Sequence, residues 1–513
     1  MYNNLVDCFE HTVHLFSNKM AILDANSKLN FKQLRARAIK LAMAISNNKK
    51  SINKPIAIFL PKSNDAIVAF IATLYTGNCY APLDVKNPMS RIIKILNKLK
   101  PVAIITDTKH LDILKSYNLD IKIITCNALP QIPNKPYNFN YKNCIDLDPA
   151  YIMHTSGSTG IPKGVAISHR SIIDYINWAI DAFTISENEI IGSQAPFIFD
   201  NSTLDIYLMV FKGATLHIIP EQLFVFPAKL LEFLETHKVN FVFWVPSVLI
   251  YIANLKLLSI YKIPSLKKVL FAGEVMPTKH LNYWIGNLNK DILYANLYGP
   301  TEITVDCTYY IINRPFKDNQ PLPIGKPCRN SDVFLLNNND ELCKTNEQGE
   351  ICVRGSSLAL GYWNDIKKTK AVFVQNPLNN SYPEKIYRTG DLAFINTMGD
   401  IIFSGRKDNQ IKHLGYRIEL GEIEHSILSI FESIIVRAIY DGQNREIVLF
   451  YESKTEIPIR LFRQKLAKVL SGYMIPAKYY KVDTMPLSLN GKIDLAALQK
   501  QFISKKKSLE MAK

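Results

Sequence analysis

The first half of the chain alternates between two hydrophobic patterns. Between residues 34 and 45 apolar residues recur three or four positions apart, which predicts an amphipathic helix that Asn30 can cap. Residues 63–74 predict a second helix, with Gly77 beyond its end. Short apolar segments that predict buried strands lie at 56–60, 103–106, 121–124, 240–245 and 268–271. Strands that alternate with helices predict an α/β fold with doubly wound, mostly parallel sheets, which bind ligands at the carboxyl ends of their strands.

Two later parts of the chain differ from this pattern. Gly and Pro become frequent between residues 321 and 361, which predicts a smaller, β-rich and more antiparallel subdomain. After Asp408 a helical segment, 419–430, precedes two strand-like segments joined by a turn at Asp441 and Gly442. We therefore expect an N-terminal domain of residues 1–407 and a small α+β C-terminal domain of residues 408–513.

Composition and charge limit the possible partners. The 513 residues include 48% hydrophobic and 21% charged residues, which is typical of folded proteins with several folding units. The net charge is +16, but the positive residues are dispersed and only Lys505–Lys507 form a dense run. We expect no nucleic-acid partner.

The cysteines and the N-terminus indicate a cellular compartment. The eight cysteines include no C-x-x-C pair and no zinc-ligand spacing with histidine, which suits a reducing environment. The N-terminus lacks the pattern of a signal peptide, and the apolar stretch 66–75 is too short to span a bilayer. We expect a cytoplasmic protein without a membrane span.

One segment rich in Ser, Thr and Gly suggests phosphate chemistry. A predicted strand, 151–154, leads into Thr155-Ser156-Gly157-Ser158-Thr159-Gly160 and then Ile161-Pro162-Lys163-Gly164. Glycines let backbone N–H groups approach an anion, and hydroxyls and a lysine add donors for phosphate oxygens. The hexamer alone is equally consistent with a flexible connection, but the Pro-Lys-Gly continuation makes the segment more specific.

The segment 151–169 resembles the phosphate loop of adenylate-forming enzymes. This superfamily includes acyl-CoA synthetases, firefly luciferase and the adenylation domains of nonribosomal peptide synthetases. Further segments match the family's motifs in the family's order: YGPTE at 298–302, YRTGD at 387–391, the hinge motif at 405–419 and PLSLNGKID at 486–494. The resemblance therefore covers nearly the whole chain.

The resemblance implies an ATP-dependent reaction in which a carboxylate attacks the α-phosphate and pyrophosphate leaves. It implies that Lys492 is the catalytic cation, that Thr301 binds the α-phosphate and that Glu302 holds Mg²⁺. It implies that Asp391 binds the ribose hydroxyls, which Arg406 can also reach, although Asp391 alone could be an ordinary turn acid. The implied ATP-binding residues are Thr155, Ser156, Gly157, Ser158, Thr159, Gly160, Lys163, Asn296, Tyr298, Gly299, Asp391 and Arg406.

The hinge motif implies a second half-reaction. In the family, the mobile C-terminal domain rotates after adenylation and presents a face that receives a thiol acceptor. Asp408 occupies the implied hinge position, where a few residues absorb the backbone rotation. A charged interdomain linker at 405–412 is a second reading that is compatible with the first.

The segment 197–205 resembles the F-D-x-S-x-x-D motif of family members that activate amino acids. Asp200 stands where those enzymes place a carboxylate against the substrate's ammonium group, and a buried acid favours a cationic partner. Asp200 could alternatively cap the following helix, and we expect Asp205 to be structural. The implied substrate pocket comprises Asp200, Asn201, Leu204, Phe243, Leu270, Ala272, Leu297, Val305 and Asp306, with Lys492 on the carboxylate. This lining suits a small or medium uncharged side chain, and Asp306 leaves room for a hydroxyl or an amine.

The acceptor is expected to be a separate carrier protein that bears phosphopantetheine. No carrier segment follows Lys492 and no condensation domain precedes the motifs, so we expect a stand-alone and monomeric ligase. It resembles D-alanine–carrier-protein ligases, but Ala272 replaces their usual Cys, and Leu495 replaces the Arg that is usual in peptide synthetases. An acyl- or aryl-CoA ligase is the alternative. The retained Lys163, Glu302, Asp391 and Lys492 argue against a non-catalytic descendant.

Overall fold

The computed structural model describes residues 2–46, 52–126, 139–157, 160–431, 433–442, 444–486, 493 and 497–498. The chain divides into two compact units. The first unit comprises Met1–Val85, Leu96–Thr155 and Lys163–Asp408, and the second comprises Lys86–Ile95, Ser156–Pro162 and Asn409–Lys513. A domain boundary between residues 407 and 408 and a hinge at Asp408 stay predictions.

A nine-stranded sheet of the first unit carries three of the predicted pocket residues, Phe243, Leu270 and Leu297. Strands β1, β10, β9, β11, β12 and β13 run parallel, and antiparallel strands extend both edges. In spatial order the strands are β15 (Lys326–Pro327), β14 (Thr308–Ile311), β13 (Leu293–Tyr298), β12 (Lys268–Phe271), β11 (Phe241–Trp244), β9 (Ile190–Ser193), β10 (Thr215–Ile218), β1 (Met20–Leu23) and β2 (Lys28–Asn30). The strands predicted at 240–245 and 268–271 are thus confirmed. The structure also shows that they are neighbours in the sheet.

A seven-stranded sheet of the first unit carries the strand before the Ser/Thr/Gly segment. Its strands in spatial order are β18 (Gly361–Tyr362), β8 (Lys163–Ser168), β7 (Pro149–Thr155), β4 (Cys79–Pro82), β3 (Pro55–Phe59), β5 (Ala103–Thr106) and β6 (Lys122–Thr125). Strands β7 and β8 are antiparallel, so residues 156–162 connect the two strands of a hairpin. The predicted strands at 56–60, 103–106, 121–124 and 151–154 are confirmed.

The Gly- and Pro-rich part of the chain forms an antiparallel sheet, as predicted. Its strands are β16 (Ser331–Leu336), β17 (Gly349–Gly355), β20 (Lys385–Ile395), β19 (Phe373–Gln375) and β21 (Ile401–Arg406), which pairs with β20. Strands β20 and β21 place Asp391 opposite Arg406.

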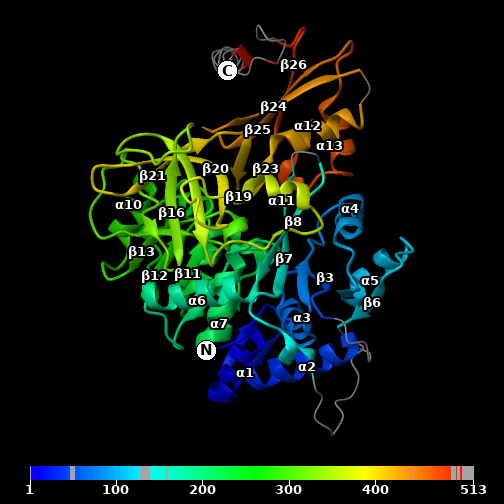
Figure 1. Ribbon diagram of the computed structural model, residues 1–513, viewed down its shortest axis with the longest axis vertical. Helices are drawn as coiled ribbons and strands as arrows, with labels where there is room; N and C mark the ends of the chain where they lie inside the picture. Colours follow the sequence, from blue (N-terminus) through cyan, green and yellow to red (C-terminus); the bar gives the residue numbers. More distant parts are fainter. Residues whose placement is uncertain are drawn as a thin grey trace. The chain divides into compact units, whose positions relative to one another are not determined.

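Helices cover the sheets of the first unit (Figure 1). They are α1 (Leu5–Phe16), α2 (Phe31–Ser46), α3 (Asn64–Tyr75), α5 (Thr108–Lys115), α6 (His169–Ala182), α7 (Asn201–Lys212), α8 (Pro227–Thr236), α9 (Pro246–Asn254), α10 (Thr278–Asn287) and α11 (Ile366–Val372). Helix α4 (Met89–Leu99) has residues in both units. The short 3-10 helices are η1 (Asn140–Asn143), η2 (Glu221–Phe224), η3 (Leu257–Ser259), η4 (Thr301–Ile303) and, in the second unit, η5 (Gly472–Met474).

The predicted cap at Asn30 is present, and the structure shows a second cap at Ser63. The Asn30 side chain accepts a hydrogen bond of 2.8 Å from the Gln33 N–H, and Gln33 accepts one of 3.0 Å from the Asn30 N–H, which forms a reciprocal cap. Ser63 caps α3 by accepting from the Ala66 N–H. Local sequence signals therefore determine where both helices begin.

The first unit's main core joins residues of both large sheets with α3, α6 and α7. Along β11 and β12 the side chains alternate between two clusters. Phe243 and Leu270 belong to the main core, whereas Trp244 and Phe271 belong to a second cluster with α8, α9 and α10. Apolar residues on both faces are typical of parallel strands that are buried on both sides.

The second unit contains an antiparallel hairpin, β22 (Gln410–His413) and β23 (Tyr416–Glu419), and a sheet of β24 (Ile435–Asp441), β25 (Glu446–Glu452) and β26 (Lys478–Lys481). Helices α12 (Leu420–Leu428) and α13 (Ile459–Leu466) contribute to its separate apolar core. The α+β character predicted after residue 408 is confirmed, as is the α/β fold of the whole chain.

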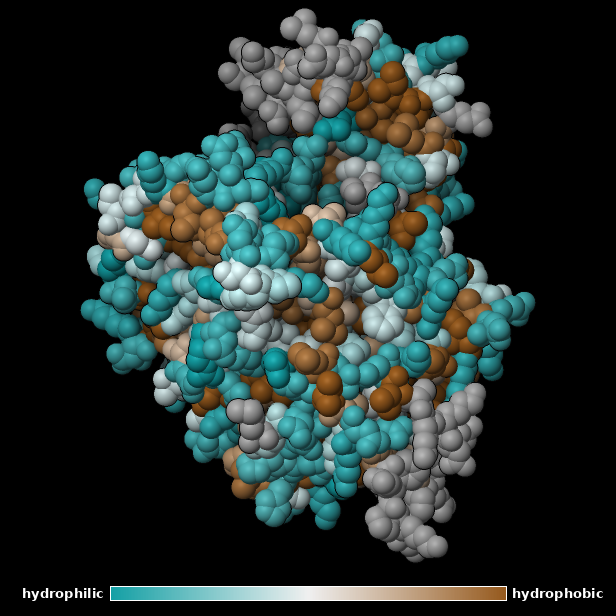
Figure 2. Space-filling view, viewed as in Figure 1, coloured by the Kyte–Doolittle hydropathy of each residue, from teal (hydrophilic) through white to brown (hydrophobic). Residues whose placement is uncertain are grey.

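The visible surface is largely hydrophilic (Figure 2). On the face shown in Figure 2, hydrophilic residues cover most of the area and hydrophobic residues form separate patches. Among the described helices, none combines the length and hydropathy that crossing a bilayer requires.

Candidate functional site

The predicted ribose-binding carboxylate is buried and held by two donors. Asp391 lies within β20, so the reading as an ordinary turn acid is wrong. Its Oδ2 accepts a hydrogen bond of 2.6 Å from the Tyr298 hydroxyl, and its Oδ1 accepts one of 2.5 Å from Arg406 Nη1. The guanidinium of Arg406 also donates to both oxygens of Asp408, at 2.7 and 2.8 Å. Burial, reinforced by Asp391, raises the pKa of Tyr298 well above its usual range, so this phenol stays a donor at neutral pH.

The predicted metal ligand, Glu302, lies fully buried in η4. The hydroxyl of Tyr362 donates to its Oε1 at 2.8 Å, and Lys163 Nζ lies 5.3 Å from the centre of the Tyr362 ring. The antiparallel pairing of β18 with β8 brings Tyr362 and Lys163 together.

The chemistry of Glu302 fits Mg²⁺, which prefers oxygen ligands and commonly combines one or two carboxylates with substrate phosphates. Among the residues that the structure describes, no group of three or more His, Cys, Asp and Glu side chains could hold a metal by itself. Glu302 would therefore hold the ion together with phosphate oxygens of ATP.

A tight crossing of the chain links Glu302 to the predicted pocket. A Cβ atom on Gly299 would lie 2.3 Å from the Val305 carbonyl oxygen, so only glycine fits there. Thr304 and Val305 both adopt positive φ angles, of 61° and 71°, which β-branched residues rarely do. The Thr304 hydroxyl stabilises this conformation by donating to the Ser357 carbonyl oxygen at 2.7 Å. The strained turn brings Val305 back over Gly299 and determines how far Asp306 lies from Glu302.

The predicted pocket residues come together in the first unit. Six of them belong to the main core and are at most 2% exposed: Leu204, Phe243, Leu270, Ala272, Leu297 and Val305. Strands β11 and β12 place Phe243 directly beside Leu270. Asp306 is also buried, whereas Asp200 and Asn201 are partly exposed. The sequence therefore identified a set of residues that the fold gathers around one apolar region.

Asp200 immediately precedes α7, but its side chain makes no capping hydrogen bond. The alternative reading of Asp200 as a helix cap is therefore wrong. Burial and then the charge of Asp200 raise the pKa of Tyr151 well above its usual range. The same charge contributes, after burial and Asp306, to the raised pKa of Tyr175.

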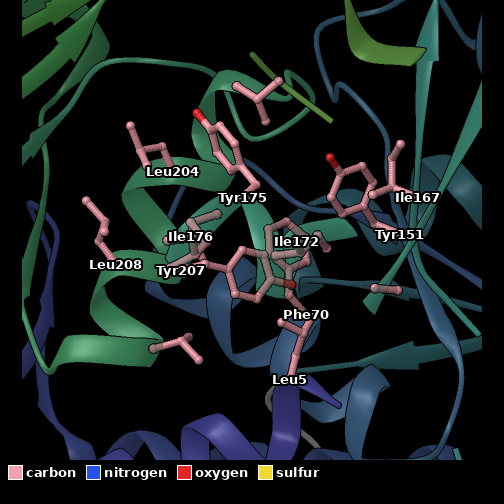
Figure 3. Close-up of a cluster of buried hydrophobic side chains, with 14 of the residues drawn as sticks. Leu5, Phe70, Tyr151, Ile167, Ile172, Tyr175, Ile176, Leu204, Tyr207 and Leu208 are labelled. Carbon is pink, nitrogen blue, oxygen red and sulfur yellow. The ribbon is translucent and has the colours of Figure 1, made fainter. Parts of the chain in front are cut away.

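The second pocket acid, Asp306, is held by a tyrosine. The Tyr175 hydroxyl donates to Asp306 Oδ2 at 2.7 Å. Figure 3 shows Tyr175 on α6, Leu204 on α7 and Tyr151 in the same buried cluster. Both acids act on Tyr175, and an apolar region with two carboxylates near it can bind a small molecule that carries an ammonium group and a further hydrogen-bond donor.

Ser156 and Gly157 of the Ser/Thr/Gly segment lie in the second unit and contact other residues of that unit. The Ser156 hydroxyl donates to the Arg417 carbonyl oxygen at 2.8 Å and accepts from the Glu419 N–H at 3.2 Å. The Gly157 N–H donates to Glu422 Oε2 at 3.3 Å. This backbone amide therefore already binds an anionic oxygen, which is the type of atom that a phosphate presents.

Several predicted residues do not enter this description. Ser158, Thr159, Lys492 and Leu495 lie outside the described residues, so the roles of the first three stay predictions. Asn296 is buried and its amide donates to the Pro323 carbonyl oxygen at 2.8 Å.

Sequence reasoning missed Tyr175 and Tyr362, which donate to the buried carboxylates. In the sequence Tyr175 is one aromatic residue on the apolar side of an amphipathic helix, which indicates core packing. Tyr362 lies just before Trp363 in β18, the two-residue strand Gly361–Tyr362, which has no periodic pattern. Only the tertiary pairing of β18 with β8 could reveal its position.

Comparison with known proteins identifies a matching family and relatives of similar sequence. A protein family described as AMP-binding enzyme matches residues 9–363. Zwittermicin A synthase ZmaJ from Bacillus cereus is 33% identical over 502 residues, covering 96% of this chain and 93% of the relative. Tyrocidine synthase 1 from Brevibacillus parabrevis is 30% identical over 493 residues. This chain spans 44% of that longer relative.

Solved structures share the fold. The Vibrio cholerae adenylation domain AlmE, in complex with glycyl-adenosine-5′-phosphate, matches with a TM-score of 0.84 at 23% identity over 98% of both chains. PA1221, a protein that contains adenylation and PCP domains, matches with a TM-score of 0.83 at 22% identity. That match covers 98% of this chain and 84% of PA1221.

Proposed function

We propose that this chain, which belongs to the family of AMP-binding enzymes, activates a small amino acid as its aminoacyl-adenylate and releases pyrophosphate. The chain is an adenylate-forming ligase of the adenylation-domain type. The finer proposal concerns the carboxylic acid that it selects. The observation that carries it is Asp200, an acid at the start of α7 that does not cap the helix.

Asp200 favours an amino acid over other carboxylic acids for an electrostatic reason. The other pocket residues are largely apolar and buried, so a cation that approaches the partly exposed carboxylate of Asp200 interacts with it more strongly than in bulk water. The α-ammonium group of an amino acid supplies that cation. An acyl or aryl acid has no such group and gains nothing from this carboxylate.

The pocket walls favour a small side chain. Phe243, Leu270 and Leu297 are fully or almost fully buried, and Ala272 is only 2% exposed. Asp306 gives this apolar region one polar group, so we propose that the side chain carries a hydroxyl or amine that can reach it. An additional methylene group in such a region typically changes affinity by about 1–3 kcal/mol.

In the proposed reaction, a carboxylate oxygen of the amino acid forms a bond to the α-phosphorus of ATP. The bond from this phosphorus to the bridging oxygen breaks, and pyrophosphate leaves. Lys163 and Thr301 would bind phosphate oxygens, and Lys492 would bridge carboxylate and phosphate. Glu302 would hold Mg²⁺, which supplies positive charge to the phosphates when bound. Asp391, oriented by Tyr298 and Arg406, would accept hydrogen bonds from the ribose.

We propose that a second step transfers the aminoacyl group to the phosphopantetheine thiol of a separate carrier protein. The thiol sulfur attacks the carbonyl carbon of the adenylate, AMP leaves and a thioester forms. The presence of adenylation and PCP domains in PA1221 supports this acceptor. The proposal also assigns the hinge at Asp408 to the change between the two steps.

ATP–pyrophosphate exchange over a panel of L- and D-amino acids and simple carboxylic acids tests the proposal. We expect exchange with one or a few small amino acids, and we expect Lys492→Ala to abolish it while ATP still binds. The acyl- or aryl-CoA ligase alternative predicts exchange with fatty or aromatic acids instead. Exchange with those acids and with no amino acid would overturn the proposal.

A further inference from the structure

A partly buried lysine, Lys62, contacts the segment that leads to Asp200. Lys62 follows β3 and immediately precedes Ser63, the cap of α3. Its ammonium donates a hydrogen bond of 2.8 Å to the carbonyl oxygen of Ser193, the last residue of β9. The same ammonium lies 5.4 Å from the centre of the Phe197 ring. Sequence reasoning assigned no role to Lys62.

Asp205 is the acid that opposes Lys62. Its side chain is fully buried, and neither carboxylate oxygen has a hydrogen-bond partner among the described residues. The negative charge of Asp205 is the largest electrostatic effect that favours the charged form of Lys62, ahead of that of Glu221. Buried polar atoms without partners are uncommon and call for an explanation.

A purely structural reason for this pair is weak. The fully buried Asp205 and the partly buried Lys62 both lose hydration, and a well-packed apolar pair of similar size is often as stable or more stable. Asp205 lies one helical turn after Asn201 on α7, so a core residue such as Leu would suit the same face. The reason for the Lys62–Asp205 pair is therefore sought in the segments that it contacts and not in its contribution to the stability of the fold.

Lys62 interacts with several points along the connection from β9 to α7. The connection begins after Ser193, passes Phe197 and ends at Asp200. Lys62 hydrogen-bonds its beginning, contacts its middle through a cation–π interaction, and attracts Asp205 in the helix at its end. The edge of Phe197 also packs on Phe70, with ring centres 5.9 Å apart.

We propose that Lys62 is a positioning residue that holds the Asp200 carboxylate at the amino group of the substrate, with Asp205 keeping Lys62 in place. This inference rests on the proposed function, because it assumes that Asp200 binds the ammonium group. Lys62 itself would touch neither substrate nor ATP. Its loss should weaken amino-acid binding and leave ATP binding intact.

Lys62→Met tests the inference because it removes the charge and retains most of the side-chain length. In the exchange assay we expect the KM for the amino acid to rise at least tenfold, with the KM for ATP changed less than twofold. Lys62→Arg should restore the amino-acid KM to within threefold of wild type. Lys54→Met, at an exposed lysine before the same strand, is the matched control and should change neither KM.

A second variant separates positioning from folding. Lys62→Met leaves Asp205 without its partner, so the double variant Lys62→Met/Asp205→Leu should recover thermal stability, as measured by the melting temperature. If Lys62 positions Asp200, the amino-acid KM of the double variant stays raised. Recovery of both stability and the amino-acid KM would overturn the inference, since a structural role would then suffice.

The remaining outcomes are also distinct. Equal increases in the KM values for amino acid and ATP in Lys62→Met would overturn the inference, and so would an unchanged amino-acid KM. A wild-type protein that exchanges no amino acid would instead overturn the proposed function itself.

Discussion

At the scale of single residues, the candidate site depends on three buried carboxylates, each held by a tyrosine hydroxyl. Tyr298 donates to Asp391 at 2.6 Å, Tyr362 to Glu302 at 2.8 Å and Tyr175 to Asp306 at 2.7 Å. Each bond orients a carboxylate in a region with little water. A tyrosine hydroxyl adds no positive charge of its own, whereas Asp391 also accepts a hydrogen bond from the Arg406 guanidinium.

Tyr362→Phe tests this arrangement at Glu302. The change removes the hydroxyl and keeps the ring beneath Lys163. A hydrogen bond to a charged group contributes about 1.5–3 kcal/mol, so we expect the Mg²⁺ concentration that supports half-maximal exchange to rise about tenfold. Tyr261→Phe removes a similar bond, to Glu232, at an exposed position and serves as the control. An equal Mg²⁺ requirement in both variants would show that Tyr362 does not orient Glu302.

Lys62 gives a prediction about pH. Burial lowers the pKa of its ammonium, and Asp205 and Glu221 oppose this shift. As pH rises through the lowered pKa, Lys62 loses its proton and its attraction to Asp205, so the amino-acid KM should increase. Arginine stays charged throughout this range. The amino-acid KM of Lys62→Arg should therefore rise less on the alkaline side, and identical profiles for the two proteins would contradict the role of the Lys62 charge.

At the scale of elements, the turn after β13 joins the proposed nucleotide-binding residues to the proposed substrate pocket. Gly299, Thr304 and Val305 lie in a crossing so close that two β-branched residues adopt positive φ angles. Such conformations cost about 1–3 kcal/mol each and persist only where surrounding contacts enforce them. The turn is therefore a fixed spacer between Glu302 and Asp306.

Gly299→Ala should disrupt this spacer, because its Cβ atom would lie 2.3 Å from a backbone oxygen. We expect a loss of about 2 kcal/mol or more in the free energy of unfolding, and higher KM values for both ATP and amino acid. Gly286 in α10 is the matched control, since a Cβ atom there meets nothing within 4 Å. Gly286→Ala should stabilise the protein by about 0.5–1 kcal/mol. Urea unfolding and exchange kinetics measure both effects, and equal behaviour of the two variants would contradict the account.

The sequence was informative where chemistry follows local pattern. Asn30 and Ser63 stand where the two predicted helices begin, and apolar segments such as 241–244 predicted strands that the structure contains. The pocket residues were predicted from motif resemblance; six of them lie in the main core, and their roles stay predictions. The same reasoning could not find three residues that the structure adds. Tyr175 and Lys62 each form a hydrogen bond with a residue more than 100 positions away in the sequence. Tyr362 lies in a short strand without a periodic pattern. The strained angles at Thr304 and Val305 likewise arise from a tertiary crossing, which no local preference predicts.

At the scale of the whole molecule, the chain forms two units whose boundary falls near the predicted hinge. Asp408 is the last residue of the first unit, where it accepts two hydrogen bonds from Arg406. A hinge there would require the backbone of Asp408 to change conformation between adenylation and transfer.

Asp408→Pro tests that requirement because proline fixes φ near −65°. Asp408→Ala removes the same carboxylate and leaves the backbone free, so it is the control. We expect the two variants to have similar ATP–pyrophosphate exchange rates, and we expect Asp408→Pro to aminoacylate a carrier protein at least tenfold more slowly. Equal transfer rates in the two variants would remove the reason to place a hinge at this residue.

The most direct test of the central claim compares an amino acid with the same molecule lacking its amino group, in wild type and in Asp200→Asn. The account predicts that wild-type kcat/KM for exchange favours the amino acid at least a hundredfold. Asp200→Asn should reduce this preference to less than tenfold while the KM for ATP stays within twofold, whereas Asp291→Asn, at an exposed acid, should change neither. If Asp200→Asn weakens both acids and ATP equally, or leaves the preference intact, Asp200 is not the partner of the substrate's ammonium group.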